Sequence, residues 1–280
     1  MLVKFYGTRG SVPVCGPDFF EFGGNTTCLQ VKAKQSDNIA IIDAGTGIRE
    51  LGKDFIESGH TQEEIFVAFT HFHWDHIQGF PFFAPAFNEG QKINILALGW
   101  GKRLKCLEDI FKTQMQKRYF PVQLSRMGAD FNFMLLKKTS KVFVTKDTNP
   151  RPVVVKTNKH NHPGGAFGYR IELDGKVMVF CTDIEHGDEI SEDVVNFSKD
   201  ADLLIHDAQF TDEELKEKSG WGHSSFSQAI EVAERANVKS LGLTHHDPDH
   251  DDSFLRQMEK KCQARFKDCF LAREKMEIEI

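Results

Sequence analysis

Short apolar runs, separated by turn-forming stretches, recur along the chain and predict buried strands. These runs lie at residues 2–6, 29–33, 39–42, 65–69, 93–98, 131–136, 142–145, 153–156, 167–173, 176–180, 201–205 and 240–243. The longer mixed stretches between them predict helices at residues 48–58, 75–80, 102–118, 188–197, 224–236 and 251–266. Strands and helices that alternate in this way predict an α/β protein in which two sheets carry helices on their outer faces.

No internal repeat, low-complexity tract or linker interrupts this pattern, so we expect one domain over residues 1–280. The composition, with 40% hydrophobic and 27% charged residues, is that of a globular protein. No apolar run approaches the roughly 18 residues of a membrane span, and the first residues lack the basic start and long apolar core of a signal peptide. We therefore expect a cytoplasmic enzyme with no membrane partner.

The formal net charge of -6 bears on the partners that the protein can bind. Nonspecific binding of long nucleic acid usually needs a strongly basic face, so long nucleic acid is not expected as a partner. The six cysteines contain no C-x-x-C pair, so their spacing predicts no thiolate zinc site and free thiols are expected. The sequence leaves the oligomeric state open, a homodimer included.

A cluster of metal-ligand side chains stands at residues 71–76, where His-Phe-His-Trp-Asp-His follows the apolar run Ile65–Phe69. In an extended chain, residues two apart share a side, which would place two histidines and the aspartate together and pack the two aromatic side chains opposite. The last histidine would aim at a neighbouring point, which suggests two metal ions. The potential ligands are His71, His73, Asp75 and His76. Imidazole and carboxylate groups are ligands that zinc, iron and manganese accept.

This segment resembles the H-x-H-x-D-H motif of the metallo-β-lactamase superfamily and matches it in full. Further landmarks of that family follow in the family's order: a single histidine at His162, a carboxylate at Asp183 directly after the strand 176–180, and a last histidine at His245 after the strand 240–243. The resemblance covers nearly the whole chain. It implies the family's fold, a four-layer αββα sandwich.

The resemblance also implies how two divalent metal ions would be held, zinc foremost and manganese or iron as alternatives. The two implied ligand sets are His71, His73 and His162 for one ion, and Asp75, His76 and His245 for the other. Asp183 would bridge both ions, with a water or hydroxide between them. The segment that begins at Asp43 resembles the family's first motif, in which the aspartate braces the metal loop through hydrogen bonds and is not a ligand.

Two segments resemble ribonuclease Z within the superfamily. Residues 205–208 resemble its H-E-A-T motif with Asp207 in place of glutamate, and residues 221–225 resemble its G-H-S-S motif around His223. The resemblance implies that Asp207 and His223 pair and that His223 serves the departing oxygen. Histidine titrates near working pH, so such a role is chemically reasonable. The alternative is a structural histidine at a helix start that bonds a nearby acid.

The function predicted from these residues and this resemblance is a dinuclear-metal-dependent hydrolase, foremost a phosphodiesterase that uses a metal-bound hydroxide. Two divalent ions, two aspartates and a hydroxide leave a small net positive charge, which suits a singly charged diester. The chain has no long glycine- and proline-rich arm of the kind with which ribonuclease Z grips tRNA. A small anionic diester such as a cyclic nucleotide is therefore preferred. The alternatives are a glyoxalase-II-type thiolester or lactone hydrolase, a ribonuclease-Z-like RNA endonuclease and a non-hydrolytic di-iron redox protein.

Several other segments carry weaker expectations. Arg9, Ser11 and Asn25 lie in turns and are expected either to contact a phosphate or to serve the turns alone. The aromatic run at residues 80–87 is expected in the core under the metal loop, with the wall of the pocket as the alternative. The basic residues of the helix at 102–118 are expected on a solvated face, with a lid for an anionic substrate as the alternative.

The remaining histidines and acids near the motifs have no ligand position to fill. His246 and Asp247 are expected to support the ligands or to form the pocket rim, and His250 to belong to a solvated helix start together with Asp249, Asp251 and Asp252. His160 and His186 are expected as bystanders or substrate contacts.

Overall fold

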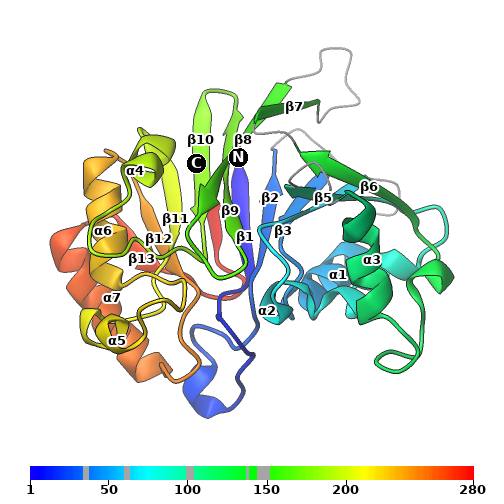
Figure 1. Ribbon diagram of the computed structural model, residues 1–280, viewed down its shortest axis with the longest axis horizontal. Coiled ribbons are helices and arrows are strands. Elements are labelled where there is room, and N and C mark those ends of the chain that lie inside the picture. Colours follow the sequence, from blue (N-terminus) through cyan, green and yellow to red (C-terminus); the bar gives the residue numbers. More distant parts are fainter. Residues whose placement is uncertain (34–37, 60–63, 99–103, 137–138, 144–151) are drawn as a thin grey trace.

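The computed structural model describes residues 1–33, 38–59, 64–98, 104–136, 139–143 and 152–280 and contains two facing β-sheets with helices on their outer sides (Figure 1). The first seven-stranded sheet has the order β14-β1-β2-β3-β4-β5-β6. Its strands are β1 (Leu2–Gly7), β2 (Cys28–Lys32), β3 (Ile39–Ile42), β4 (Ile65–Phe69), β5 (Lys92–Leu98), β6 (Asp130–Leu136) and β14 (Glu277–Glu279).

The second seven-stranded sheet has the order β13-β12-β11-β10-β9-β8-β7. Its strands are β7 (Thr139–Phe143), β8 (Pro152–His160), β9 (Ala166–Leu173), β10 (Lys176–Cys181), β11 (Leu203–Asp207), β12 (Leu241–Thr244) and β13 (Cys269–Leu271). Neighbouring strands run parallel from β3 to β6 in the first sheet and from β10 to β13 in the second. All other neighbouring strands are antiparallel.

Helices cover the outer face of each sheet (Figure 1). The first sheet carries α1 (Ile48–Glu57) and α3 (Leu104–Gln114); the second carries α4 (Glu192–Ser198), α6 (Phe226–Arg235) and α7 (Asp252–Arg265). Two short helices, α2 (Trp74–Ile77) and α5 (Asp212–Glu217), lie in connecting segments. The predicted αββα architecture is therefore confirmed. Among the described residues, no helix is both long enough and apolar enough to cross a lipid bilayer.

Strand alternation sorts the side chains into three apolar layers. On β10, Met178 and Phe180 join the cluster between the sheets, whereas Val179 and Cys181 join the cluster under the outer helices. The first sheet likewise packs α1 and α3 against its own outer face. Both sheets are thus held in place from two sides, which fixes the strand ends that carry the candidate chemistry.

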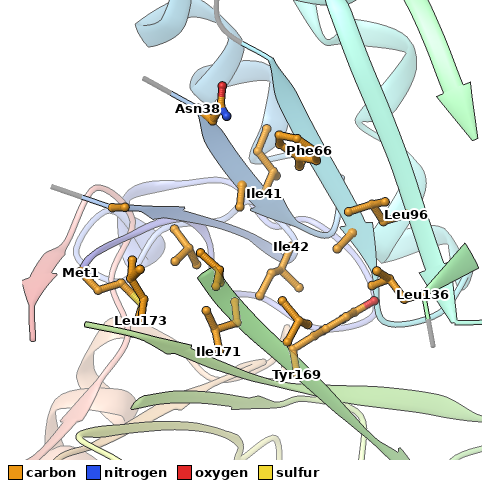
Figure 2. Close-up of a pocket in the computed structure, with 16 residues that line it drawn as sticks. Met1, Asn38, Ile41, Ile42, Phe66, Leu96, Leu136, Tyr169, Ile171 and Leu173 are labelled. Atoms are coloured by element: carbon orange, nitrogen blue, oxygen red, sulfur yellow. The ribbon is translucent and has the colours of Figure 1, made fainter. Parts of the chain in front are cut away.

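A pocket of about 90 Å³ lies between the two sheets (Figure 2). Ile42 of the first sheet and Ile171 of the second are among its lining residues, and its lining is apolar apart from Asn38 and the Tyr169 hydroxyl. That hydroxyl donates a hydrogen bond of 2.6 Å to the Phe69 carbonyl and so ties the sheets together. Because the pocket offers no metal ligand, it belongs to the packing between the sheets.

The element boundaries differ from the predicted ones at several places. The strand predicted at 153–156 extends to His160, the helix predicted at 102–118 is described from Leu104 and ends at Gln114, and the helix predicted at 188–197 begins only at Glu192. Among the α-helices and strands of the described residues, α5, β13 and β14 were not predicted. The two strands are three residues long and lie at sheet edges, so their sequences carry little periodicity.

Candidate metal centre

The candidate ligands gather where strands of both sheets end. Residues 71–76 follow β4, Asp183 follows β10 and His245 follows β12 directly, while His162 follows the antiparallel strand β8. The carboxyl ends of parallel strands meet at one edge of a sheet, where ligand sites of open α/β sheets are commonly found. Ligands from both sheets therefore meet beside the ends of the strands that they follow.

The structure brings all the predicted metal ligands together in two groups. In each group the candidate ligand atoms lie within 4.8 Å of one another. One group is His71, His73 and His162, and the other is Asp75, His76, Asp183 and His245. The spread of the atoms suits coordination of one ion by each group after small adjustments.

Asp183 lies between the two groups. Its Oδ1 is 3.7 Å from Nε2 of His71 and 3.8 Å from Nε2 of His162, both in the first group. The same carboxylate is 3.4 Å from Nε2 of His245 and 3.3 Å from Nε2 of His76, in the second group. Its position is the one that a carboxylate shared by two cations would take.

Unusual backbone conformations aim several of these side chains. Asp43, Asp183 and His245 have φ values of 63°, 58° and 65°, in the left-handed region that few residues other than glycine adopt. Two neighbouring glycines leave room for the imidazole rings: a Cβ at Gly10 would lie 2.3 Å from Nδ1 of His245, and one at Gly222 would lie 2.1 Å from Nδ1 of His162. Strained residues of this kind cluster at functional sites.

Hydrogen bonds at Nδ1 orient three of the histidines. His76 Nδ1 lies 2.8 Å from Oδ2 of Asp43, and His162 Nδ1 lies 2.9 Å from the Gly222 carbonyl. His245 Nδ1 lies 3.0 Å from Oε1 of Gln209. Donation from Nδ1–H to an oxygen fixes the tautomer and leaves Nε2 with its lone pair toward the centre, as is usual for histidine metal ligands.

The buried carboxylates and imidazole nitrogens of the centre form a favourable environment for cations. Nε2 of His71 and Nε2 of His76 are buried, and although carboxylate oxygens lie near both, neither nitrogen forms a well-aligned hydrogen bond among the described residues. Although burial opposes it, the carboxylates of Asp183 and Asp75 raise the pKa of His76 well above its usual value. The same carboxylates raise the pKa of His245 to about 9, again against the effect of burial. The donor set and its orphaned nitrogens therefore fit a pair of metal ions, which would replace the protons on these rings.

His71 and Asp183 are held in their metal-binding forms. Burial and the neighbouring His76 hold the pKa of His71 well below its usual value, so this ring is neutral. Burial would raise the pKa of Asp183, but the histidines, led by His245, hold it well below its usual value. A neutral imidazole and an ionised carboxylate are the forms that coordinate metals.

Asp43 braces the loop as the sequence leads one to expect. Its Oδ1 accepts from the Thr70 N–H and its Oδ2 from the Thr70 hydroxyl, each at 2.8 Å, in addition to the contact with His76. Asp43 is fully buried. Asp43 therefore contacts a candidate ligand but is not itself part of either ligand group.

We expect Asp43→Asn to weaken metal binding without abolishing the fold. The amide is nearly isosteric but carries no charge, and its nitrogen cannot accept a proton from His76 Nδ1. Loss of such an outer partner costs roughly 10- to 100-fold in metal affinity. Competition with a chromophoric chelator measures this, and Asp54→Asn, in a carboxylate on α1 that bonds Tyr6 and Lys4, is the matched control. An unchanged affinity in Asp43→Asn would contradict the bracing role.

The predicted pair of Asp207 and His223 forms beside the centre. His223 Nδ1 lies 2.9 Å from Oδ2 of Asp207, and both residues are buried. The Asp207 carboxylate also accepts from three backbone N–H groups at 3.0, 3.2 and 3.0 Å, those of Asp183, Gln209 and Ser224. One ring nitrogen of His223 lies within 4.8 Å of ligand atoms of His162 and Asp183. The shorter aspartate therefore still reaches its histidine.

Near the motifs, the expectation for Trp74 is wrong, and the structural alternative holds for Arg9. Trp74 is 66% exposed and does not pack opposite the ligands, because the extended chain ends at His73 and α2 begins at Trp74. Arg9 is fully buried and donates to the backbone carbonyls of Gly23, Asp247 and His250, so it serves the fold and is not placed to meet a phosphate.

The other two turn residues, Asn25 and Ser11, have different partners. Asn25 donates to Glu274, whereas Ser11 is exposed and donates its N–H to Oδ2 of Asp75 at 2.9 Å. His250 is not solvated: it is buried and contacts Glu214 at 2.9 Å. Asp252 is buried as well and accepts from the backbone N–H groups of residues 21 and 22.

The expected bystanders His160 and His186, and His246, which was expected to support the ligands or form the pocket rim, each contact a group outside the two ligand groups. His160 Nδ1 lies 3.0 Å from the Thr182 carbonyl, and His186 Nε2 lies 3.3 Å from Nε2 of His206. His246 is buried with Nε2 2.9 Å from the Ala272 carbonyl. None of these rings belongs to a ligand group of the described residues.

The aromatic run and the basic helix split between interpretations. Phe80 and Phe83 are buried in the core, whereas Phe82 is 56% exposed. Lys112 is exposed and pairs with Glu108, which agrees with a solvated face; Lys102 and Arg103 lie outside the described residues.

Sequence reasoning missed two polar residues beside the centre. Gln209 holds His245 through Oε1, and its Nε2 reaches the Asp247 carboxylate at 3.4 Å. Lys218 contacts the same carboxylate at 3.3 Å and lies over the Phe210 ring. Gln209 directly follows the segment 205–208, so its place in the sequence was the one available signal.

The sequence is similar to those of known proteins. A family model described as the beta-lactamase superfamily domain matches residues 39–246. A ribonuclease Z of Sulfurisphaera tokodaii is 30% identical over 231 residues, which cover 74% of this chain and 77% of that protein. The chain belongs to the metallo-β-lactamase superfamily. It is a metal-dependent hydrolase of that superfamily.

Solved structures of superfamily members share the fold. The metallo-β-lactamase fold protein YhfI of Bacillus subtilis has a TM-score of 0.70 and 18% identity, with 99% of each chain covered. A diphosphatase of the PhnP family has a TM-score of 0.69 and 16% identity, with 100% of this chain and 97% of that chain covered. At these identities the likeness concerns the fold alone.

Proposed function

We propose that this superfamily member is a dinuclear-metal phosphodiesterase that hydrolyses a small or cyclic phosphodiester. Zinc is the metal we expect, with manganese or iron as alternatives. Two groups of ligands with Asp183 between them support two metal positions. Both sheets contribute ligands to the centre, which also supports one domain over residues 1–280.

The observation that carries the proposal is the position of His223. Its ring lies beside ligand atoms of both groups, yet its Nδ1 is committed to Asp207. Nε2 has no hydrogen-bond partner among the described residues and is the nitrogen that can serve a substrate. A diester with an alkoxide leaving group needs a proton at the departing oxygen, and a positioned imidazole can provide it. A thiolester would need this help less.

Asp207 is suited to hold that imidazole ready. Burial raises the pKa of Asp207, but His223 outweighs burial and lowers it below the usual value, so the carboxylate is ionised. An ionised carboxylate at Nδ1 favours the tautomer with Nδ1–H and holds the ring in one orientation. Three backbone N–H groups fix the carboxylate in place, so the ring is oriented before substrate arrives.

The chemistry splits between the metals and the chain. Two bound divalent ions would supply an activated water and neutralise charge on the phosphoryl oxygens. The histidines and aspartates of the two groups would hold the ions, and Asp183 would keep them at a fixed separation. Ser11, whose N–H bonds Asp75, lies at the exposed side of the centre where a substrate oxygen could approach.

A ribonuclease-Z-like RNA endonuclease is the second candidate. The relative of Sulfurisphaera tokodaii bears the name ribonuclease Z, which favours RNA as a substrate. The net charge of -6 and the lack of a long glycine- and proline-rich arm in the sequence favour a small diester. Both candidates use the same bond type, so the size of the substrate distinguishes them.

A hydrolysis screen tests the proposal. The protein purified without chelator should contain about two metals per chain and should cleave bis(p-nitrophenyl) phosphate and a cyclic nucleotide. An oligoribonucleotide, a thiolester and a β-lactam are tested in parallel, with chelator-treated protein as the control. Faster cleavage of the oligoribonucleotide than of every small diester would favour the RNA endonuclease. Faster turnover of the thiolester, or one metal per fully loaded chain, would contradict the proposal.

A further inference from the structure

A cleft of about 790 Å³ lies across α2 from the metal centre. Its volume falls within the range of small-molecule sites, roughly 300–1,000 Å³. One wall comes from the segment 72–82 and the other from α3 and the residues that follow it. The aromatic side chains of the lining are Phe72, Trp74, Phe82, Tyr119 and Phe120.

Part of the first wall belongs to α2, the short helix that also holds two candidate ligands. Trp74, Ile77 and Gln78 line the cleft, while Asp75 and His76 belong to the second ligand group. The residues that line the cleft recur at the helical spacing of three and four, which places them on one side of the helix. The cleft and the second ligand group therefore lie on different sides of the same short helix.

Three aromatic side chains of the lining remain open to solvent. Trp74 is 66%, Phe82 56% and Tyr119 70% exposed, and the Phe82 ring packs edge-on against Phe120 at 5.3 Å. Exposed large apolar side chains that gather at a cleft mark a binding surface. They come from two segments that lie far apart in the sequence, 72–82 and the residues after α3, so their meeting is a product of the fold.

We infer that this cleft binds the planar heteroaromatic base of a nucleotide-type substrate whose phosphodiester lies at the metal centre. The inference rests on the proposed phosphodiesterase function. Aromatic rings offer faces on which a base stacks, and every base has such a face. The lining carries one charged residue, Asp109, which suits a neutral ring. Thr113 of α3 offers a hydroxyl to the edge of the base, and Gln114 offers its Oε1, which is unpaired among the described residues, because its Nε2 donates to the Ile77 carbonyl.

Chemistry at the two ends of the site separates this occupant from others. An acyl chain would need neither stacking faces nor polar groups beside them. A free peptide carries no phosphodiester that the cationic metal pair would bind. A nucleotide combines an anionic diester with an uncharged aromatic ring in one molecule. The site has the same two parts, a cation-binding centre and an aromatic cleft, on the two sides of α2.

Two esters with the same leaving group test the inference. Thymidine 5′-(p-nitrophenyl phosphate) carries a base and methyl p-nitrophenyl phosphate does not. The wild-type protein should prefer the thymidine ester in kcat/KM. Trp74→Ala and Tyr119→Ala should each reduce the ratio of the two kcat/KM values roughly five- to 150-fold, the range expected for loss of one base stack. Phe20→Ala, at an 80% exposed aromatic residue that does not line the cleft, is the matched control.

Binding without turnover separates this inference from the proposed function. Calorimetric titration of the protein with AMP and with ribose 5-phosphate should show tighter binding of AMP, and Tyr119→Ala should remove the difference. If neither ester is hydrolysed but AMP binding depends on Tyr119, the proposed function fails and the cleft assignment stands. Equal kcat/KM ratios in wild type and both variants, or equal affinities for AMP and ribose 5-phosphate, would overturn the assignment. Tyr119 is remote in sequence from the ligands, so its variant tests the cleft even if Trp74→Ala disturbs the metals.

Discussion

Asp183→Asn should reduce turnover more than loss of any single outer partner of the ligands, which costs roughly 10- to 100-fold. The carboxylate lies 3.3–3.8 Å from four histidine nitrogens that belong to both ligand groups. A neutral amide offers one oxygen in place of two and carries no charge. Two cations would then repel each other with less negative charge between them. At least one of the ions should be lost or bound much more weakly.

Metal analysis and kinetics on bis(p-nitrophenyl) phosphate measure the effect together. Asp202→Asn is the matched control. Asp202 is a buried carboxylate directly before β11, at the end of that strand away from the metal centre, and it bonds Lys176, Lys239 and the Val177 N–H. The control should keep its metals and its turnover. Both ions and near-normal turnover in Asp183→Asn would show that Asp183 does not bridge them.

The layered fold and the collection of candidate ligands could be predicted because their signals are local. Each buried strand is a short apolar run, and each candidate ligand stands within a few residues of a strand end. Strand ends are where an α/β fold places its sites, so a histidine or aspartate at that position carries information about space as well as chemistry. Asp183, two residues after β10, is the clearest case.

Predictions that assumed an unbroken local pattern were wrong where the backbone changes. His73 is extended, but Trp74 opens α2, and the alternation of sides stops there. The helix turns Trp74 outward and keeps Asp75 and His76 inward, both buried. A six-residue window holds too little periodicity to reveal such a change from strand to helix.

Contacts between distant segments could not be predicted from one sequence. Arg9 donates to carbonyls 238 and 241 residues away, so nothing near it signals its burial. His250 stands in an acidic, apparently solvated stretch, yet Glu214, 36 residues earlier, reaches it. The edge strand β14 exists because β1 offers it a partner, and its own sequence, Glu-Ile-Glu, gives almost no signal. Such features depend on how complete elements meet.

His223→Ala should separate proton transfer from metal binding. His223 bonds Asp207 through Nδ1 and is not needed to complete either ligand group, so the metal content should stay normal. Turnover of a diester with an alkoxide leaving group should fall roughly 10²- to 10⁴-fold, the contribution of a positioned general acid. A p-nitrophenyl ester leaves as a stable anion, so the same variant should lose far less on that substrate.

Two further variants sharpen this comparison. Asp207→Asn should show a milder form of the same pattern, because Asp207 acts on the substrate only through His223. His186→Ala is the matched control, since His186 lies on the loop after Asp183 but belongs to neither ligand group. It should leave the ratio of the two turnover rates unchanged.

Each outcome of the His223→Ala experiment assigns a role. Equal losses on both substrates would mean that His223 positions the substrate and does not donate the proton. Loss of metal would make His223 a ligand, which its distance of under 4.8 Å from ligand atoms of His162 and Asp183 permits. Unchanged turnover on both substrates would reduce the pair with Asp207 to a structural contact at the start of α6. In that case the thiolester hydrolase, which needs no acid at this position, would become the better account of the site.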